Sequence, residues 1–305
     1  MAEYSTQITD KGQVDLNLRP GVPVIDTHIH LWDRDRHEYP WLARWTHLGE
    51  LVDADLLAAA APDLAGAVFI EAAVRQEDAL AELEWLAGQA ARCRFPVRVI
   101  AQQLPGRPLW WSAATGGGLV AGVRRVMHLA EPGAVAAAEF AADARAAGDA
   151  GVLVELTIRH EQLDEVEALL RRVPDTRFVL DHLGKPAPQD ADGFEPWATA
   201  VARVAANRNV VCKLSSIAVQ AGNPEFRPEV AVEYVGRALA EFGADRCVYG
   251  TDWPVLTHAT SFATWLDVVI AALEYTTATE RRAVFADTAR ALYGFTAAPA
   301  TEGTP

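Results

Sequence analysis

Positive charge is scarce in this chain of 305 residues. Lysine and arginine together number 27 against 41 aspartates and glutamates, so the formal net charge is −14 and the isoelectric point is near 5.0. This balance argues against nucleic acid and anionic membranes as partners. It does not restrict a small substrate. We therefore expect a small-molecule partner, and assembly into a homo-oligomer is left open.

Cysteine is also rare. The chain has three cysteines, Cys93, Cys212 and Cys247, with no CxxC spacing. Cys212 and Cys247 lie in strand-like runs, which predicts small core side chains and a reducing compartment. Residues 1–13 lack the apolar stretch of a signal peptide, and no window reaches the length of a membrane span. These absences predict a cytoplasmic protein.

Apolar residues make up 50% of the sequence, enough for one sizeable core. Residues 1–20 are predicted to form a polar N-terminal arm and residues 296–305 a flexible tail of small residues. No break in composition divides residues 21–295, which predicts a single domain there. Eight short β-rich runs lie in this part: Val24–His30, Ala67–Ala72, Val97–Gln102, Gly122–Met127, Val152–Ile158, Arg177–His182, Asn209–Ser215 and Arg246–Asp252.

Helical patterns alternate with these runs. Val232, Val235, Leu239 and Phe242, for example, recur three or four positions apart. Around Trp110 the chain is rich in proline and glycine, so any helix there must be short. The predicted helices are Glu77–Arg92, Ala134–Ala147, Glu161–Arg172, Glu195–Ala206, Pro228–Phe242, Thr264–Leu273 and Glu280–Tyr293.

Eight β–α steps in a chain of this length predict an α/β fold of the (β/α)8 TIM-barrel type. A doubly wound sheet is the alternative, but no glycine-rich phosphate loop follows the first strand. In a barrel, catalytic groups lie at the carboxyl ends of the strands. Each predicted strand carries a polar side chain at or near that end: His28 and His30, Glu71, Gln102, Arg124, Glu155, His182, Lys213 and Asp252.

Two of these ends have the residue types of a metal site. His28 and His30 are two apart, so on a strand their imidazoles leave the same face. Imidazole and carboxylate are ligands for zinc or a similar divalent ion, with Asp252 bridging the metal and a water. Asp26 shares the strand face and is predicted to hold an imidazole nitrogen from behind. Two strand histidines with only local hydrogen bonds are the alternative.

His182 is interpreted as a further metal ligand or as an electrophile that faces a substrate carbonyl. Its neighbour Asp181 falls on the opposite strand phase, which favours a structural cap over a catalytic role. Arg124 and Lys185 are predicted clamps for a carboxylate or a hydroxyl-rich substrate, and arginine offers a two-pronged donor. For Lys185, a solvated loop lysine is the alternative.

Four more residues are predicted to contact the substrate. Trp32 and Trp253 directly follow the strands that carry His30 and Asp252, and either wall the pocket or pack at its rim. Glu71 and Glu155 are predicted to bind sugar hydroxyls, to act as acid or base, or to pair with Arg124.

At these residues the chain resembles the amidohydrolase-superfamily group of lactonases, which includes fuconolactonase-, rhamnonolactonase- and pyrone-dicarboxylate-lactonase-like enzymes. The resemblance covers roughly residues 22–295. It implies a TIM barrel and ring-opening hydrolysis of a lactone. The motifs that carry it are VIDTHIHLW at 24–32, YPWL at 39–42, GVR at 122–124, DHLGKP at 181–186, KLS at 213–215 and GTDWPV at 250–255.

The chain also departs from the wider superfamily. Arg124 ends the fourth strand where a carbamylated lysine would bridge two metals, so the resemblance implies at most one divalent ion, zinc by preference, with a metal-free mechanism left open. Glu155 stands where related chains have histidine or aspartate, and Ser216 stands where the group often has glycine.

The resulting prediction is a hydrolase that opens the ring of a sugar-acid or related carboxylated lactone. Asp252 takes a proton from the attacking water and later protonates the departing alkoxide. Either a metal on His28 and His30, or His182 and Arg124 alone, stabilises the developing oxyanion. One alternative is a decarboxylase or hydratase of an aromatic-derived acid. A second is a barrel that binds ligand without catalysis, which would require a broken His/Asp set.

Overall fold

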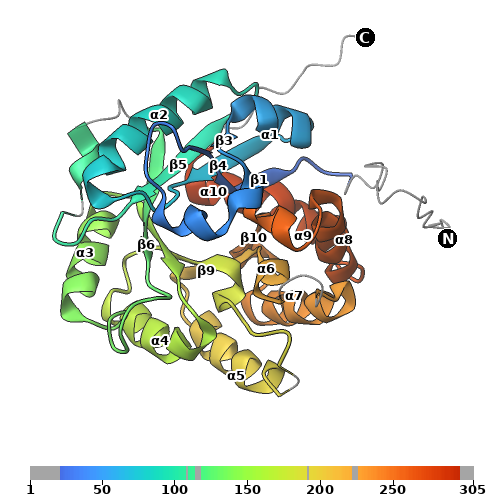
Figure 1. Cartoon of the computed structure of the whole chain (residues 1–305). Helices are drawn as coiled ribbons and strands as arrows, with labels where there is room; N and C mark the ends of the chain where they lie inside the picture. Colours follow the sequence, from blue (N-terminus) through green and yellow to red (C-terminus); the bar gives the residue numbers. More distant parts are fainter. Residues whose placement is uncertain (1–20, 108, 114–117, 191, 222–225, 296–305) are drawn as a thin grey trace, which may run out of the picture.

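A ring of eight parallel strands forms the centre of the computed structural model (Figure 1). The structure describes residues 21–107, 109–113, 118–190, 192–221 and 226–295, so the predicted arm and tail lie outside the described residues. The strands are hydrogen-bonded in chain order. They are β1 Ile25–His30, β4 Gly66–Ile70, β5 Val97–Gln102, β6 Val120–Val126, β7 Leu153–Thr157, β8 Phe178–Leu180, β9 Val210–Leu214 and β10 Cys247–Tyr249.

The last strand returns to the first. Past the end of β10, the backbone N–H of Asp252 donates to the His28 carbonyl at 2.9 Å, and His30 N–H donates to the Trp253 carbonyl at 2.8 Å. The two catalytic-looking motifs at opposite ends of the sequence are therefore neighbours through main-chain hydrogen bonds. The predicted (β/α)8 barrel is confirmed.

Helices cover the outside of the ring (Figure 1). The bounds of most of them follow the predicted periodicity closely. The helix Ala138–Asp149 starts four residues later than predicted, the short helix Ile217–Ala221 was not predicted, and the last stretch is divided by a π-helical segment, Ala283–Asp287. The helices are α2 Ala79–Arg92, α3 Ala138–Asp149, α4 Leu163–Arg172, α5 Phe194–Ala205, α6 Ile217–Ala221, α7 Pro228–Phe242, α8 Phe262–Ala272, α9 Ala278–Arg282 and α10 Thr288–Tyr293.

A small excursion after β1 was not predicted. β2 (Trp32–Asp33) and β3 (Leu51–Val52) pair antiparallel, and α1 (Ala54–Ala60) follows them. A strand of two residues is too short to show an alternation of polar and apolar residues, so the sequence pattern did not predict β2 and β3. The start of α1 did carry a signal, because Asp53 caps it by accepting from the N–H groups of Asp55 and Leu56.

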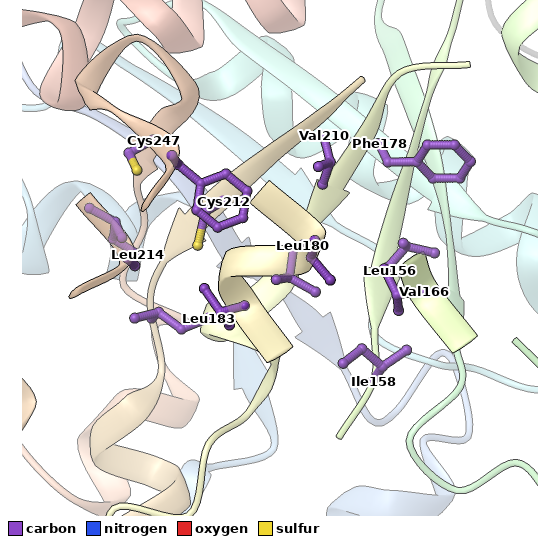
Figure 2. Close-up of a cluster of buried hydrophobic side chains, with 14 of the residues drawn as sticks. Leu156, Ile158, Val166, Phe178, Leu180, Leu183, Val210, Cys212, Leu214 and Cys247 are labelled. Carbon is purple, nitrogen blue, oxygen red and sulfur yellow. The ribbon is translucent and has the colours of Figure 1, made fainter. Parts of the chain in front are cut away.

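The hydrophobic core lies mainly between the strands and the helices. Figure 2 shows part of it, where Phe178 and Leu180 of β8 meet side chains from neighbouring strands and helices. Cys212 and Cys247 are buried free cysteines in the same cluster, as predicted. Among the described helices, none combines the length and the apolar character that crossing a membrane requires.

A smaller apolar cluster fills the inside of the barrel. It combines strand residues such as Ile25, Val68 and Val248 with Ala289 and Tyr293 of α10. In Figure 1 α10 lies behind the ring, near its centre. The C-terminal helix thus contributes to the barrel interior, and the polar strand ends lie above this apolar layer.

The strands β5, β6 and β7 pack so closely at Gly122 that the position leaves no room for a side chain. A Cβ atom there would lie 2.5 Å from Leu153 Cδ1, 2.7 Å from Leu153 O and 2.9 Å from Ile100 Cδ1. Overpacking of this kind costs about 1–3 kcal/mol, so Gly122→Ala should lower the free energy of unfolding by that amount. Denaturant titration measures it.

The matched control is Gly236→Ala within α7, where an added Cβ meets nothing within 4 Å. Alanine is the better helix former, so this change should raise the stability by up to about 1 kcal/mol. Equal effects of the two substitutions would contradict the packing argument.

Candidate active site

The backbone is strained along the carboxyl edge of the barrel. In the described part of the chain, every non-glycine residue with positive φ lies just beyond a barrel strand. Left-handed φ costs ordinary residues about 1–2 kcal/mol, and such strain tends to collect at functional sites. The residues and their φ angles are Ala73 (53°), His182 (55°), Leu183 (55°), Lys185 (48°), Ser216 (59°) and Asp252 (67°).

Three buried side chains at this edge form a triangle of donor atoms. His28 Nε2 lies 3.2 Å from His30 Nε2, and Asp252 Oδ1 lies 3.7 Å and 3.5 Å from the same two nitrogens. Zinc–ligand bonds of about 2.0–2.2 Å in tetrahedral geometry place donor atoms about 3.3–3.6 Å apart. The spacing and chemistry of His28, His30 and Asp252 therefore fit one divalent ion.

The protonation of the two histidines in this triangle also suits a metal. Burial lowers the pKa of His28 and of His30 well below the usual value, so both imidazoles are neutral, as ligation requires. His30 Nδ1 lies 3.1 Å from the Ile70 carbonyl, which can only accept, so the proton is assigned to Nδ1 and the lone pair to Nε2. Burial raises the pKa of Asp252 to about 7, against the opposing effects of Ser216 and Lys185.

His182 belongs to a second group. Together with His28 and Asp181 it forms another triad of donors, and its Nδ1 lies 2.8 Å from Ser215 Oγ. The single set of four ligands predicted from sequence is thus divided in two, with His28 shared. The predicted roles of these residues stay predictions.

The strand phase predicted for Asp181 was wrong, because its side chain lies on the same side as His28, while its predicted structural role stays a prediction. It is fully buried, its Oδ1 lies 3.1 Å from Lys213 Nζ and 3.6 Å from His28 Nδ1, and its Oδ2 accepts from Thr157 at 2.7 Å. Burial acts to raise the pKa of Asp181, but Lys213 and His28 hold it well below the usual range. Strand phase failed because β8 ends at Leu180 and a 3-10 turn follows at once.

Lys213 lies beneath the histidines and was the main omission from the predicted site. Its fully buried ammonium donates to Glu155 Oε2 at 2.6 Å and lies 3.2 Å from His28 Nδ1. The other oxygen of Glu155 accepts from the Tyr293 hydroxyl at 2.7 Å. Glu155 was predicted to contact the substrate. The structure instead buries it fully, with both carboxylate oxygens occupied by Lys213 and Tyr293.

Arg124 is held by Glu71, one of the alternatives weighed for that glutamate. The Arg124 Nε donates to Glu71 Oε1 at 2.6 Å and its Nη2 donates to the Glu71 carbonyl at 2.7 Å. The remaining nitrogen, Nη1, lies 3.4 Å from His28 Nε2 and so faces the donor triangle. Lys185 is partly buried, and burial lowers its pKa to about 8, so it differs from a freely solvated loop lysine.

Other predicted positions lie at the margin. Trp32 is fully buried, stacks edge-on against Trp41 and donates to the Gly49 carbonyl, which fits rim packing. Trp253, next to Asp252, is 8% exposed.

Asp26 does not hold an imidazole as predicted. It accepts from the His28 backbone N–H at 3.0 Å and from the Thr251 N–H and hydroxyl at 3.0 and 2.6 Å. Gln102 donates to the Val74 carbonyl at 3.1 Å.

Fold and site together define a (β/α)8 barrel of the amidohydrolase type. The family model described as amidohydrolase matches residues 25–295, and the chain belongs to that family. An L-fucono-1,5-lactonase of Burkholderia multivorans is 28% identical over 259 residues, 78% of this chain and 84% of the relative. An L-fucono-1,5-lactonase of Burkholderia ambifaria is 38% identical over 133 residues, 42% of this chain and 44% of the relative.

Solved structures agree on the architecture. An amidohydrolase from Burkholderia multivorans with bound zinc matches with a TM-score of 0.79 at 26% identity, over 90% of this chain and 99% of its own. A dihydroxybenzoic acid decarboxylase from Polaromonas matches with a TM-score of 0.60 at 15% identity, over 91% of this chain and 98% of its own, which shows the fold alone.

The buried ammonium of Lys213 should be essential to stability. Removing one partner of a buried charge pair costs about 3–5 kcal/mol because the other charge is left uncompensated. Lys213→Met leaves the buried carboxylates of Glu155 and Asp181 without their cation, so we expect a loss of that size in the free energy of unfolding. As a control, Arg171→Met removes an exposed ion pair with Glu167 and should change stability by about 1 kcal/mol or less. A small loss in Lys213→Met would contradict the account.

Proposed function

We propose that this protein hydrolyses a sugar-acid or related carboxylated lactone by attack of water on the ring carbonyl. The observation that carries the proposal is the position of Asp252, whose carboxylate faces two neutral imidazoles across 3.5 and 3.7 Å. A carboxylate with a pKa near 7 is suited to accept a proton from water and to return it. The lactonase relatives support this choice of reaction.

The proposed steps conserve atoms and charge. The oxygen of a water bonds to the carbonyl carbon while Asp252 accepts one of its protons. The ring carbon–oxygen bond then breaks, and Asp252 returns the proton to the departing alkoxide. The product is an open chain with one new carboxylic acid and one new hydroxyl group.

Cations at the barrel mouth stabilise the developing oxyanion in this proposal. Arg124 is oriented by Glu71 with Nη1 toward the site, and Lys185 is close enough to Asp252 to perturb its pKa. His182 Nδ1 lies 2.8 Å from Ser215 Oγ, and the centre of its ring lies 4.4 Å from that of His28. Preorganised donors of this kind supply transition-state stabilisation without reorganising.

His28, His30 and Asp252 are the residues that would hold one divalent ion, and zinc suits this donor set. The zinc-bound structure of the Burkholderia multivorans amidohydrolase supports that choice. When bound, such an ion polarises the carbonyl and acidifies water.

A lactone screen tests the reaction class. Purified protein is mixed with sugar-acid and carboxylated lactones in weakly buffered pH indicator, and each hydrolysis releases one acid. We expect acid release with at least one lactone. No acid release from the panel, together with carbon dioxide release from hydroxybenzoic acids, would replace lactone hydrolysis with decarboxylation.

On a responsive lactone, Asp252→Asn should lower kcat by about 10²–10⁴-fold, because the amide keeps the shape of the carboxylate but cannot accept the proton. Circular dichroism monitors folding. The control is Asp175→Asn, an exposed residue before β8 at the opposite end of the barrel. A folded Asp252→Asn protein with kcat within a few-fold of the unchanged protein would remove Asp252 from the mechanism.

A further inference from the structure

Ser216 occupies a conformation that glycine adopts without cost. It follows β9 with φ 59°, in the left-handed region, and its side chain is almost fully buried at 1% exposure. Its hydroxyl donates to Asp252 Oδ2. A strained residue persists where its side chain contributes something that the unstrained residue lacks. Here the contribution that glycine lacks is this hydroxyl.

The hydrogen bond determines which oxygen of Asp252 faces the histidines. With Oδ2 held by Ser216, Oδ1 is the atom that lies 3.5 Å from His30 Nε2 and 3.7 Å from His28 Nε2. The backbone of Asp252 is anchored separately, through its N–H to the His28 carbonyl. Main chain and side chain are therefore fixed at two points, and the carboxylate has one orientation toward the donor triangle.

The adjacent serine has a different partner. Ser215 Oγ lies 2.8 Å from His182 Nδ1, so the two consecutive hydroxyls contact the two donor triads separately. The left-handed turn at Ser216 also begins α6, because the Ser216 carbonyl accepts from the Val219 N–H at 3.0 Å. A glycine would serve that backbone role equally well, so it does not account for the serine.

We propose that Ser216 is a positioning residue that orients Asp252 and so preorganises the His28, His30 and Asp252 triangle for a divalent cation. The inference deepens the proposed function, because the same carboxylate moves the proton there. Partners that orient a metal ligand affect metal affinity or activity by about 10–100-fold when removed.

Zinc binding by the metal-free protein tests this without any substrate. Ser216→Gly and Ser216→Ala both remove the hydroxyl, and competition with a chelating indicator measures the dissociation constant for zinc. We expect each variant to bind zinc about 10–100-fold more weakly than the unchanged protein. Affinity within about two-fold of the unchanged protein in both variants would overturn the proposal.

Thermal unfolding separates positioning from a merely structural role. Only Ser216→Gly relieves the left-handed strain, so it should melt about 2–4 °C above Ser216→Ala while binding zinc equally weakly. If zinc affinity instead follows the melting temperature, Ser216 is structural. The matched control is Ala73→Gly, which relieves similar strain at φ 53° without removing a hydroxyl and should leave zinc affinity unchanged.

Kinetics at saturating zinc complete the test. On a responsive lactone, both Ser216 variants should lose kcat by about 10–100-fold with KM altered by no more than about three-fold, because orientation of the base affects the chemical step. An increase in KM with unchanged kcat would overturn the positioning role. If the unchanged protein opens no lactone, the proposed function fails, and zinc affinity still decides the role of Ser216.

Discussion

The buried ammonium of Lys213 is the contact on which the rest of the site depends. It lies between Glu155 and Asp181 with no exposed surface, and it touches His28 from below. Buried carboxylates are costly unless a cation and further hydrogen bonds compensate them, and Lys213 supplies that cation to both. Because Glu155 also accepts from Tyr293, the same network ties the C-terminal helix to the floor of the site. The stability of the fold and the orientation of His28 thus both depend on Lys213.

Above that floor, the barrel mouth combines neutral donors with strained backbone. Burial keeps His28 and His30 uncharged and raises the pKa of Asp252, so the donor atoms of the three side chains lie within 3.7 Å of one another without a large charge conflict. The left-handed residues after β8, β9 and β10 turn the chain sharply as soon as each strand ends. Those turns place short side chains from separate strands close together. If the strands continued instead, the same side chains would lie farther apart.

Much of this arrangement was predictable from sequence, and the failures have identifiable physical reasons. The alternation of strand and helix patterns predicted the barrel, and the positions of the strand ends predicted that His28, His30 and Asp252 lie together. Both predictions were possible because they depend on local periodicity. Asp181 was misread because strand phase ceases to apply where the 3-10 turn begins. The burial of Glu155 depends on Tyr293, 138 residues away, and no local pattern reports such a contact. The contact of Ser216 with Asp252 arises from a left-handed turn, and a serine in the sequence does not indicate such a turn.

The proposed mechanism depends on attack of water at the lactone carbonyl. Opening a responsive lactone in water labelled with oxygen-18, followed by mass spectrometry of the product, tests it directly. Acyl attack places one labelled oxygen in the new carboxylate and none in the new hydroxyl, after subtraction of the spontaneous reaction. Label in the hydroxyl, or an opened product without label, would contradict it.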